Sequence, residues 1–178
     1  TLVEIDAWHA VTFVDNHDTE PGQSLESFVL SWFKPLAYAL ILLRIDGLPC
    51  VFYGDLYGIP AKNVPAVAEL PTLMKIRELY AYGEQHDYLD QPDVIGWTRS
   101  GSDEFTGSGL AVVLSNRCGG SKRMYIGTNH VGKEFRDILG HSTDTVTIDE
   151  DGCGEFSCCD GSVSVWLEKA LKVEVSLD

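Results

Sequence analysis

The sequence predicts a parallel α/β unit followed by an antiparallel β domain, and three observations support this fold class. Val11 to Val14 is a short apolar run typical of a buried strand, and it ends abruptly in the polar cluster Asp15–Asp18. Pro49 to Tyr53 is a second apolar run that also ends in a polar turn. After about Gly83 the helical spacing of apolar residues stops, and short apolar runs separated by Gly, Asp, Asn and Ser take its place.

Two helical segments follow the two predicted strands. From Leu25 to Arg44 apolar residues recur at steps of three and four, which predicts a helix with a wide apolar face. Pro35 interrupts this pattern and predicts a kink, or two helices that meet there. Leu70 to Tyr82 has the same spacing and predicts the second helix. The order strand, helix, strand, helix implies parallel strands joined by right-handed crossovers.

The second half contains six short runs that read as strands. Strands of this length and spacing are typical of an antiparallel sandwich or barrel. The predicted strands are Val94–Thr98, Gly109–Ser115, Arg123–Thr128, Thr145–Ile148, Gly154–Ser157 and Ser162–Leu167.

Composition and charge narrow the function classes. The 178 residues carry a net charge of −14, and such a surface repels phosphate backbones, so a nucleic-acid partner is not expected. The longest apolar run, Leu36–Leu43, is far shorter than the roughly 20 residues that span a membrane, so no membrane partner is expected. The five cysteines form no C-x-x-C pair. They are read as free thiols in a reducing compartment, which predicts a cytoplasmic protein; a redox-sensitive pair at Cys158 and Cys159 is the alternative.

The polar cluster at Asp15–Asp18 is the strongest candidate site. In α/β barrels the carboxyl ends of the strands carry the catalytic groups. From the residues alone, the cluster could be a metal site, the carboxylate site of a hydrolase, or a polar turn satisfied by its own hydrogen bonds. A barrel of this kind needs about 200 residues or more, so most of one would precede Thr1. We therefore expect the chain to be the C-terminal piece of a larger enzyme.

Two motifs resemble signature regions of the α-amylase family of glycoside hydrolases. FVDNHDT, residues 13–19, resembles the signature at the end of barrel strand seven, and GLPCVFYGD, residues 47–55, resembles the signature at strand eight. WFKPLAYALIL, LMKIRELYAYGEQHDY and GWTR match as well, so the resemblance to the C-terminal part of liquefying-type members covers nearly the whole chain. It implies that residues 1–83 are the last strands and helices of a (β/α)8 TIM barrel. Residues 84–172 are then an antiparallel Greek-key β-sandwich and residues 173–178 a tail.

The resemblance also implies an activity, the retaining endohydrolysis of α-1,4-glucosidic bonds in starch- or glycogen-type glucans. Asp18 maps to the third catalytic carboxylate, which stabilises the transition state, and His17 maps to a residue that binds the sugar at the cleaved bond. Gln23, in the loop beyond, is a candidate contact to a glucose hydroxyl. Asp15 and Asn16 are read as supports of the strand end or as local turn formers. Neither the family's nucleophile nor its acid/base signature occurs in the chain, so we expect the 178 residues alone to be inactive.

Calcium is the cofactor that the resemblance implies. Asp93 and Asn116 map to side-chain ligands and Pro92 to a carbonyl ligand, and the amide at Asn116 in place of a carboxylate is expected to weaken the site. The expected partner is an α-glucan, and the intact protein is expected to be a monomer. Two alternatives remain open at this point: a non-catalytic carbohydrate-binding or regulatory remnant of an α-amylase, and a transglycosylase that shares the same carboxylates.

Overall fold

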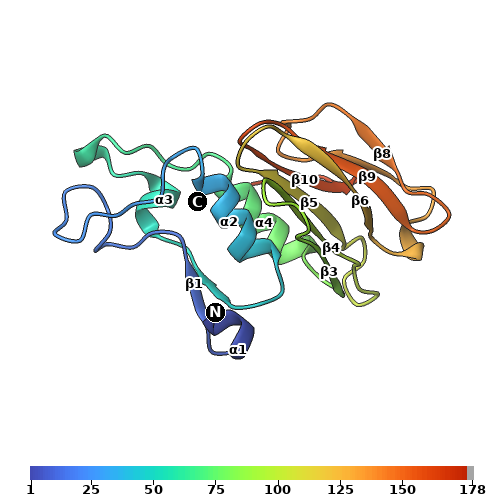
Figure 1. Ribbon diagram of the computed structural model, residues 1–178, viewed down its shortest axis with the longest axis horizontal. Coiled ribbons are helices and arrows are strands. Elements are labelled where there is room, and N and C mark those ends of the chain that lie inside the picture. Colours follow the sequence, from blue (N-terminus) through green and yellow to red (C-terminus); the bar gives the residue numbers. More distant parts are fainter. Residues whose placement is uncertain (176–178) are drawn as a thin grey trace.

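Two helices lie between a pair of short parallel strands and a larger β region in the computed structural model, which describes residues 1–175 (Figure 1). Of the predicted tail, residues 176–178 lie outside the described residues. The N-terminal elements are α1 (Leu2–Ile5), β1 (Val11–Phe13), α2 (Lys34–Leu43), β2 (Leu48–Cys50), α3 (Tyr53–Tyr57), the 3₁₀ turn η1 (Pro60–Lys62) and α4 (Leu70–Tyr80).

The pairing of β1 with β2 is parallel, as the strand–helix order predicts. Val11 lies opposite Leu48 and Phe13 opposite Cys50. Gly47 lets the chain enter β2 this close to β1, because its φ of 88° suits glycine and a Cβ there would lie 2.7 Å from Thr12 Cγ2. The two strands therefore end at the same edge, next to each other.

The second half is antiparallel β structure, as predicted. Its elements are β3 (Gln85–Tyr88), β4 (Val94–Arg99), β5 (Leu110–Ser115), β6 (Gly120–Tyr125), the 3₁₀ turn η2 (Thr128–His130), β7 (Glu134–Asp137), β8 (Thr145–Thr147), β9 (Cys153–Cys158) and β10 (Val163–Glu168). Six strands form one sheet in the order β3-β4-β5-β10-β7-β8, and β6 pairs with β9 in a second, two-stranded sheet.

The six-stranded sheet is buried on both faces. From β10, Val163, Val165 and Leu167 belong to the same core as the apolar residues of α2 and α4. Trp166 points to the opposite face and packs with Phe156 of β9, at 5.9 Å between ring centres. The sheet is thus the middle of three layers, with the two helices on one side and β6 and β9 on the other (Figure 1).

The predicted helix from Leu25 to Arg44 is wrong over its first half. Only Lys34–Leu43 is helical, and Pro35 lies in the first turn of α2 instead of kinking a longer helix. Proline suits this position because the first N–H groups of a helix have no intrahelical acceptor and φ is already set near the helical value. Residues 25–33 form a loop despite their apolar spacing.

One further prediction from the sequence needs correction, and two strands are not predicted at all. The strand predicted at 49–53 is β2 at Leu48–Cys50, and Tyr53 already begins α3. The strands β3 and β7 have no counterpart in the prediction, because QHDY and EFRD are mostly polar and lack an apolar alternation. Both lie next to longer strands, β4 and β10, which supply their backbone partners.

His130 links the pH to the stability of the β domain. Its ring is buried, Nε2 lies 3.0 Å from the Ser100 carbonyl oxygen, and Nδ1 is buried without a partner among the described residues. Burial lowers the pKa of His130 below its ordinary 6.5. The unfolded chain therefore binds a proton at a higher pH than the folded chain does. The stabilisation from a neutral His130 is present at high pH and is lost as the pH falls through the unfolded value.

The thermal midpoint of the wild type is expected to fall as the pH is lowered from about 7.5 to 5.5. We expect this fall to be smaller in His130→Gln, because glutamine cannot take up a proton on unfolding. Thermal denaturation followed by circular dichroism at a series of pH values measures this slope. His9→Gln is the control for loss of an exposed histidine, since the His9 side chain is 84% exposed. An equal slope in the wild type and in His130→Gln would contradict the assignment.

Candidate functional site

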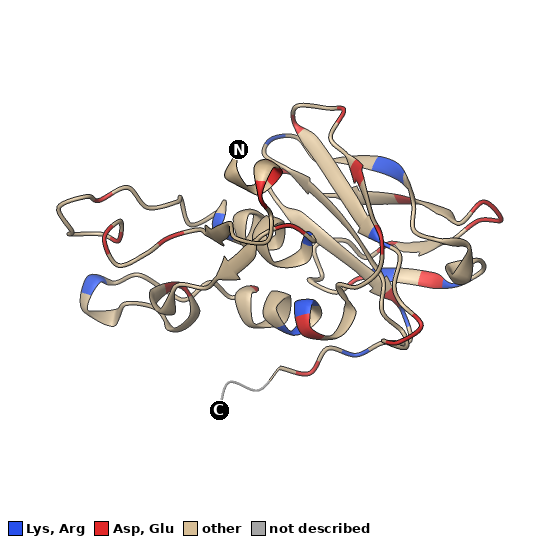
Figure 2. Cartoon of the chain, turned by 90° about the horizontal axis from the view of Figure 1, so that it is seen from below, with Lys and Arg blue, Asp and Glu red and all other residues tan. Residues whose placement is uncertain are grey.

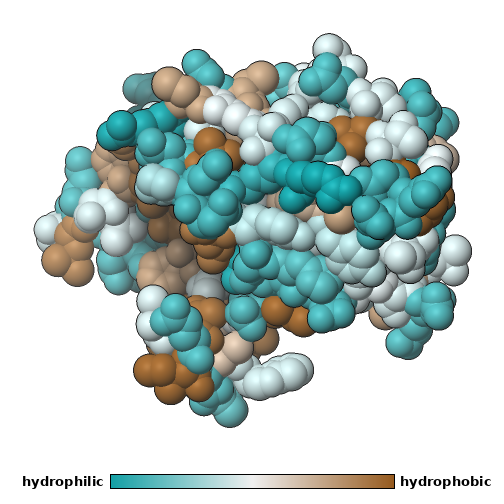
Figure 3. Space-filling model, turned by 45° about the vertical axis from the view of Figure 1, so that its right-hand side comes forward, coloured by the Kyte–Doolittle hydropathy of each residue, from teal (hydrophilic) through white to brown (hydrophobic). Residues whose placement is uncertain are grey.

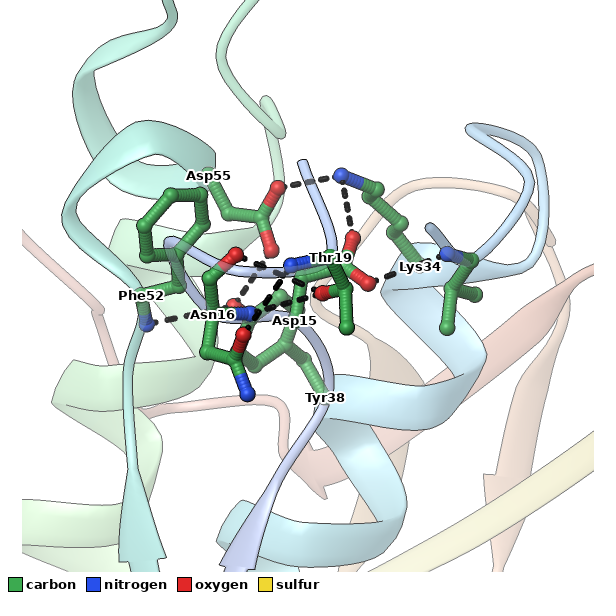
Figure 4. Close-up of polar contacts among 8 residues, drawn as sticks. Asp15, Asn16, Thr19, Lys34, Tyr38, Phe52 and Asp55 are labelled. Carbon is green, nitrogen blue, oxygen red and sulfur yellow. Dashed lines mark hydrogen bonds and ion pairs between the residues drawn. The ribbon is translucent and has the colours of Figure 1, made fainter. Parts of the chain in front are cut away.

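A buried lysine joins the ends of the two parallel strands. Lys34 Nζ lies 2.8 Å from Asp15 Oδ2 and also forms an ion pair with Asp55, and all three side chains are buried (Figure 4). Asp15 follows β1, Asp55 lies in α3 just after β2, and Lys34 is the first residue of α2. One cation between two carboxylates thus ties three elements together at the edge where β1 and β2 end.

Tyr38 extends this polar group by one turn of α2. Its hydroxyl donates to Asp55 Oδ2 at 2.7 Å and accepts from the Phe52 backbone N–H at 3.4 Å (Figure 4). Burial, together with the bond to Asp55, raises the pKa of Tyr38 far above its ordinary value, so the hydroxyl keeps its proton. Burial alone would lower the pKa of Lys34, but its hydrogen bonds to Asp15 and Asp55 outweigh burial and raise it. Lys34 is therefore charged at neutral pH.

The residues after Asp15 turn away from this buried group towards solvent. Asn16 Oδ1 accepts from the backbone N–H groups of Asp18 and Thr19 at 2.9 and 3.1 Å, which closes a tight turn. His17 and Asp18 are carried on that turn, with side chains 85% and 59% exposed and 3.4 Å between His17 Nε2 and Asp18 Oδ1. The two polar residues nearest the strand end thus hold the backbone, and the next two present a base and a carboxylate outward.

Gln23 is held within the same loop by local contacts. Its amide donates to Glu20 Oε1 at 3.1 Å, and Glu20 also pairs with Lys62 at 2.6 Å. These hydrogen bonds lower the pKa of Glu20 below its ordinary value, with the bond to Lys62 as the main cause. Lys62 belongs to η1, so the segment after α3 supports the loop that carries Gln23.

The supporting ion pairs are the part of the site that sequence reasoning missed. Asp15 and Asn16 are predicted as supports or turn formers, and their hydrogen bonds fit those roles. Asp55 is noted in the sequence only as the polar end of the second strand, and Lys34 and Tyr38 are not predicted to belong to the site. A usable signal exists: carboxylates follow both predicted parallel strands, and Lys34 stands next to Pro35, which marks a helix start. Two carboxylates at adjacent strand ends call for a cation between them.

Asp93 and Asn116 do not form a calcium site by themselves. The two residues are adjacent, because the Asn116 N–H donates to the Asp93 carbonyl oxygen at 3.3 Å, but the Asp93 carboxylate faces Arg117 Nε at 3.5 Å. Within residues 1–175 no group of three His, Cys, Asp or Glu side chains is placed to hold a metal ion. One carboxylate shared with a guanidinium and one amide are too few oxygen ligands for calcium. Calcium binding therefore stays a prediction of the resemblance.

No helix among the described residues combines the length and the apolar character needed to cross a membrane.

Comparison with known proteins finds similarity to α-amylases. The family model described as α-amylase C-terminal matches residues 110–167, which run from β5 to β10. An α-amylase from Geobacillus stearothermophilus is 57% identical over 97% of this chain. A glucan 1,4-α-maltohexaosidase from Bacillus sp. strain 707 is 54% identical over 95% of it. The chain is therefore similar, over nearly its whole length, to the C-terminal part of these two relatives.

The match covers the C-terminal part of these α-amylases only. The chain spans about a third of the length of the two relatives, 32% and 33%. The solved structure of α-amylase I from Eisenia fetida, as an E249Q mutant with maltohexaose, superposes with a TM-score of 0.63 at 15% identity and covers 93% of this chain and 42% of its own. At that identity the structural likeness supports the fold alone.

We expect Lys34→Met to destabilise the protein by about 3–5 kcal/mol, because it leaves two buried carboxylates without their cation. Chemical denaturation followed by tryptophan fluorescence gives the free energy of unfolding. Lys169→Met is the matched control: Lys169 pairs with Glu134 at 3.0 Å, but both side chains are half exposed, so its loss should cost under about 1 kcal/mol. Equal losses in the two variants would contradict a structural role for Lys34.

Proposed function

We propose that the chain works as the C-terminal part of an α-amylase that hydrolyses α-1,4-glucosidic bonds within starch- or glycogen-type glucans. The observation that carries the proposal is the identity of 57% and 54%, over nearly the whole chain, to proteins named as α-amylase and maltohexaosidase. In this proposal the chain supplies Asp18 and His17, and the nucleophile and the acid/base belong to a preceding part of the enzyme. The 178 residues alone are then inactive.

We further propose that β1 and β2 are the last two strands of a (β/α)8 barrel and that the β-sandwich begins after α4, near residue 83. The exposed apolar face of β1 and β2 supports this placement. Val11, Phe13 and Leu48 are all more than half exposed, and hydrophobic residues are visible over this N-terminal part of the surface (Figure 3). Such a face is normally covered by neighbouring strands and side chains in a parallel barrel.

The placement of Asp18 and His17 is compatible with the chemistry that the resemblance assigns to them. Hydrolysis by retaining glycosidases passes through a transition state with positive charge on the sugar ring. A carboxylate held beside the ring favours that charge, and an imidazole that donates to a sugar hydroxyl binds more strongly as the charge develops. Asp18 and His17 are exposed on a turn that follows Asp15, and buried Asp15 holds the start of that turn. Both side chains are therefore free to contact a glucan while the backbone beneath them stays fixed. Gln23 lies in the loop beyond and would bind a glucose hydroxyl.

A chimera tests the proposal directly. The C-terminal part of the Geobacillus stearothermophilus α-amylase is replaced by residues 1–178 of this chain, and the release of reducing ends from starch is measured. We expect the chimera to hydrolyse starch, and Asp18→Asn to lower its kcat/KM by at least about 100-fold, because a preorganised charge opposite the transition state is removed. Asp144→Asn, at an exposed turn of the β domain, is the control and should keep full activity.

The outcomes separate the alternatives. A folded chimera that binds starch without cleaving it would favour a non-catalytic carbohydrate-binding remnant. Transfer of glucan chains to a sugar acceptor, in place of release of reducing ends, would favour a transglycosylase. Unchanged activity in Asp18→Asn would overturn the assignment of Asp18.

A further inference from the structure

A second polar site lies on the side of the helices that faces the edge of the six-stranded sheet. The C-terminal end of α2, the last turns of α4 and the end of β4 enclose a cavity of about 520 Å³. Three of the six arginines of the chain, Arg44, Arg77 and Arg99, line it. Acidic residues outnumber basic ones 27 to 13 and are spread over both parts of the molecule, so this concentration of arginine is unusual for the chain (Figure 2).

Arg44 is already neutralised. Its two terminal nitrogens bind both carboxylate oxygens of Asp87 at 2.7 and 2.9 Å, and its guanidinium lies 5.8 Å from the centre of the Trp97 ring. This bidentate pair uses two of the five guanidinium donors and compensates the charge of Arg44. Arg44 therefore forms a wall of the cavity and offers no uncompensated charge to a ligand.

Arg77 and Arg99 have no carboxylate partner among the described residues. Within the described residues, neither side chain takes part in an ion pair at 4.0 Å or less. Nine other lysines and arginines do form such an ion pair. Arg77 donates one bond to the carbonyl oxygen of Leu42 at the end of α2, and Arg99 donates one bond to that of Gly83 at 3.1 Å. Since a guanidinium carries five N–H donors, both retain donors for a further acceptor.

The two charges lie near enough to interact, and Arg99 is buried while Arg77 is partly exposed. Arg99 is only 6% exposed. Burial lowers the pKa of Arg99, and the positive charge of Arg77 lowers it further. Glu78 also lines the cavity, but it pairs with Lys75 at 3.0 Å. The negative charge of Asp46 acts on Arg99 in the opposite direction and is the smaller cause. Two neighbouring cations with no carboxylate at ion-pair distance in the described part of the chain are costly, and a shared anion would reduce that cost.

We propose that Arg77 and Arg99 bind one oxyanion, a phosphate or a carboxylate, between their two guanidinium groups. Arginine suits this task because its planar donors match the oxygen pairs of phosphate and carboxylate. The oxyanion can come from a free small molecule or from a carboxylate side chain of a preceding segment of the longer protein. The cavity lies at the C-terminal end of α2, whereas Asp15, which precedes the turn of Asp18, pairs with Lys34 at the N-terminal end of α2, so the site is separate from the proposed glucan site.

The test uses inorganic phosphate as the probe, at constant ionic strength so that general screening does not change. Phosphorus NMR line width and the thermal midpoint are followed during titration of the 178-residue chain and of the chimera described above. We expect saturable binding that Arg77→Gln weakens by about tenfold or more. Arg117→Gln is the control, because Arg117 is exposed and pairs loosely with Asp93. Arg99→Lys keeps the buried charge without the planar donors and should also weaken binding.

Each outcome decides the proposal. Binding by both proteins supports a site for a free anion. Binding by the chain alone supports a carboxylate of the preceding segment that fills the site in the chimera. Absence of saturable binding in both proteins, or equal binding in Arg77→Gln and Arg117→Gln, would overturn the proposal.

Discussion

The ion pairs of Lys34 with Asp15 and Asp55 are the interaction on which the N-terminal part of the structure depends. Short strands such as β1 and β2, of three residues each, gain little from their own hydrogen bonds. The lysine fixes where both strands end and where α2 begins, because its single ammonium group must reach two carboxylates at once. Asp15 in turn accepts the Val29 N–H at 3.0 Å, so the loop that returns to α2 is held by the same carboxylate.

The first two and the last two residues of the motif Asp15–Asp18 have different roles. The first two residues use their side chains on the protein itself, and the last two offer theirs to solvent. The helix that carries Lys34 also packs its apolar residues, Leu36 and Leu43 among them, in the core shared with β10. A change in the β domain can therefore reach the loop of His17 and Asp18 through α2. This packing gives a physical reason for the β domain to accompany the loop of His17 and Asp18.

Elements that depend on the local spacing of apolar residues can be predicted from the sequence. Elements that depend on contacts between distant residues cannot. The parallel strands, the helix at Leu70 and the antiparallel β region follow from apolar spacing, and the structure confirms them. Residues 25–33 have helical spacing but form a loop, because Asp15 binds the Val29 N–H and Pro35 sets the helix start later. The strands β3 and β7 are mostly polar, and only their stronger neighbours make them strands. Similarly, no periodicity marks Lys34 or Arg99, since burial of a charge depends on partners distant in the sequence.

A double-mutant cycle between Asp15 and Lys34 tests the central claim most directly. The free energies of unfolding are measured for the wild type, Asp15→Asn, Lys34→Met and the double variant. If the pair fixes the strand ends, the double variant loses less than the sum of the single losses, with a coupling of about 1–3 kcal/mol. Additive losses would show that Lys34 and Asp15 act independently and would contradict the account.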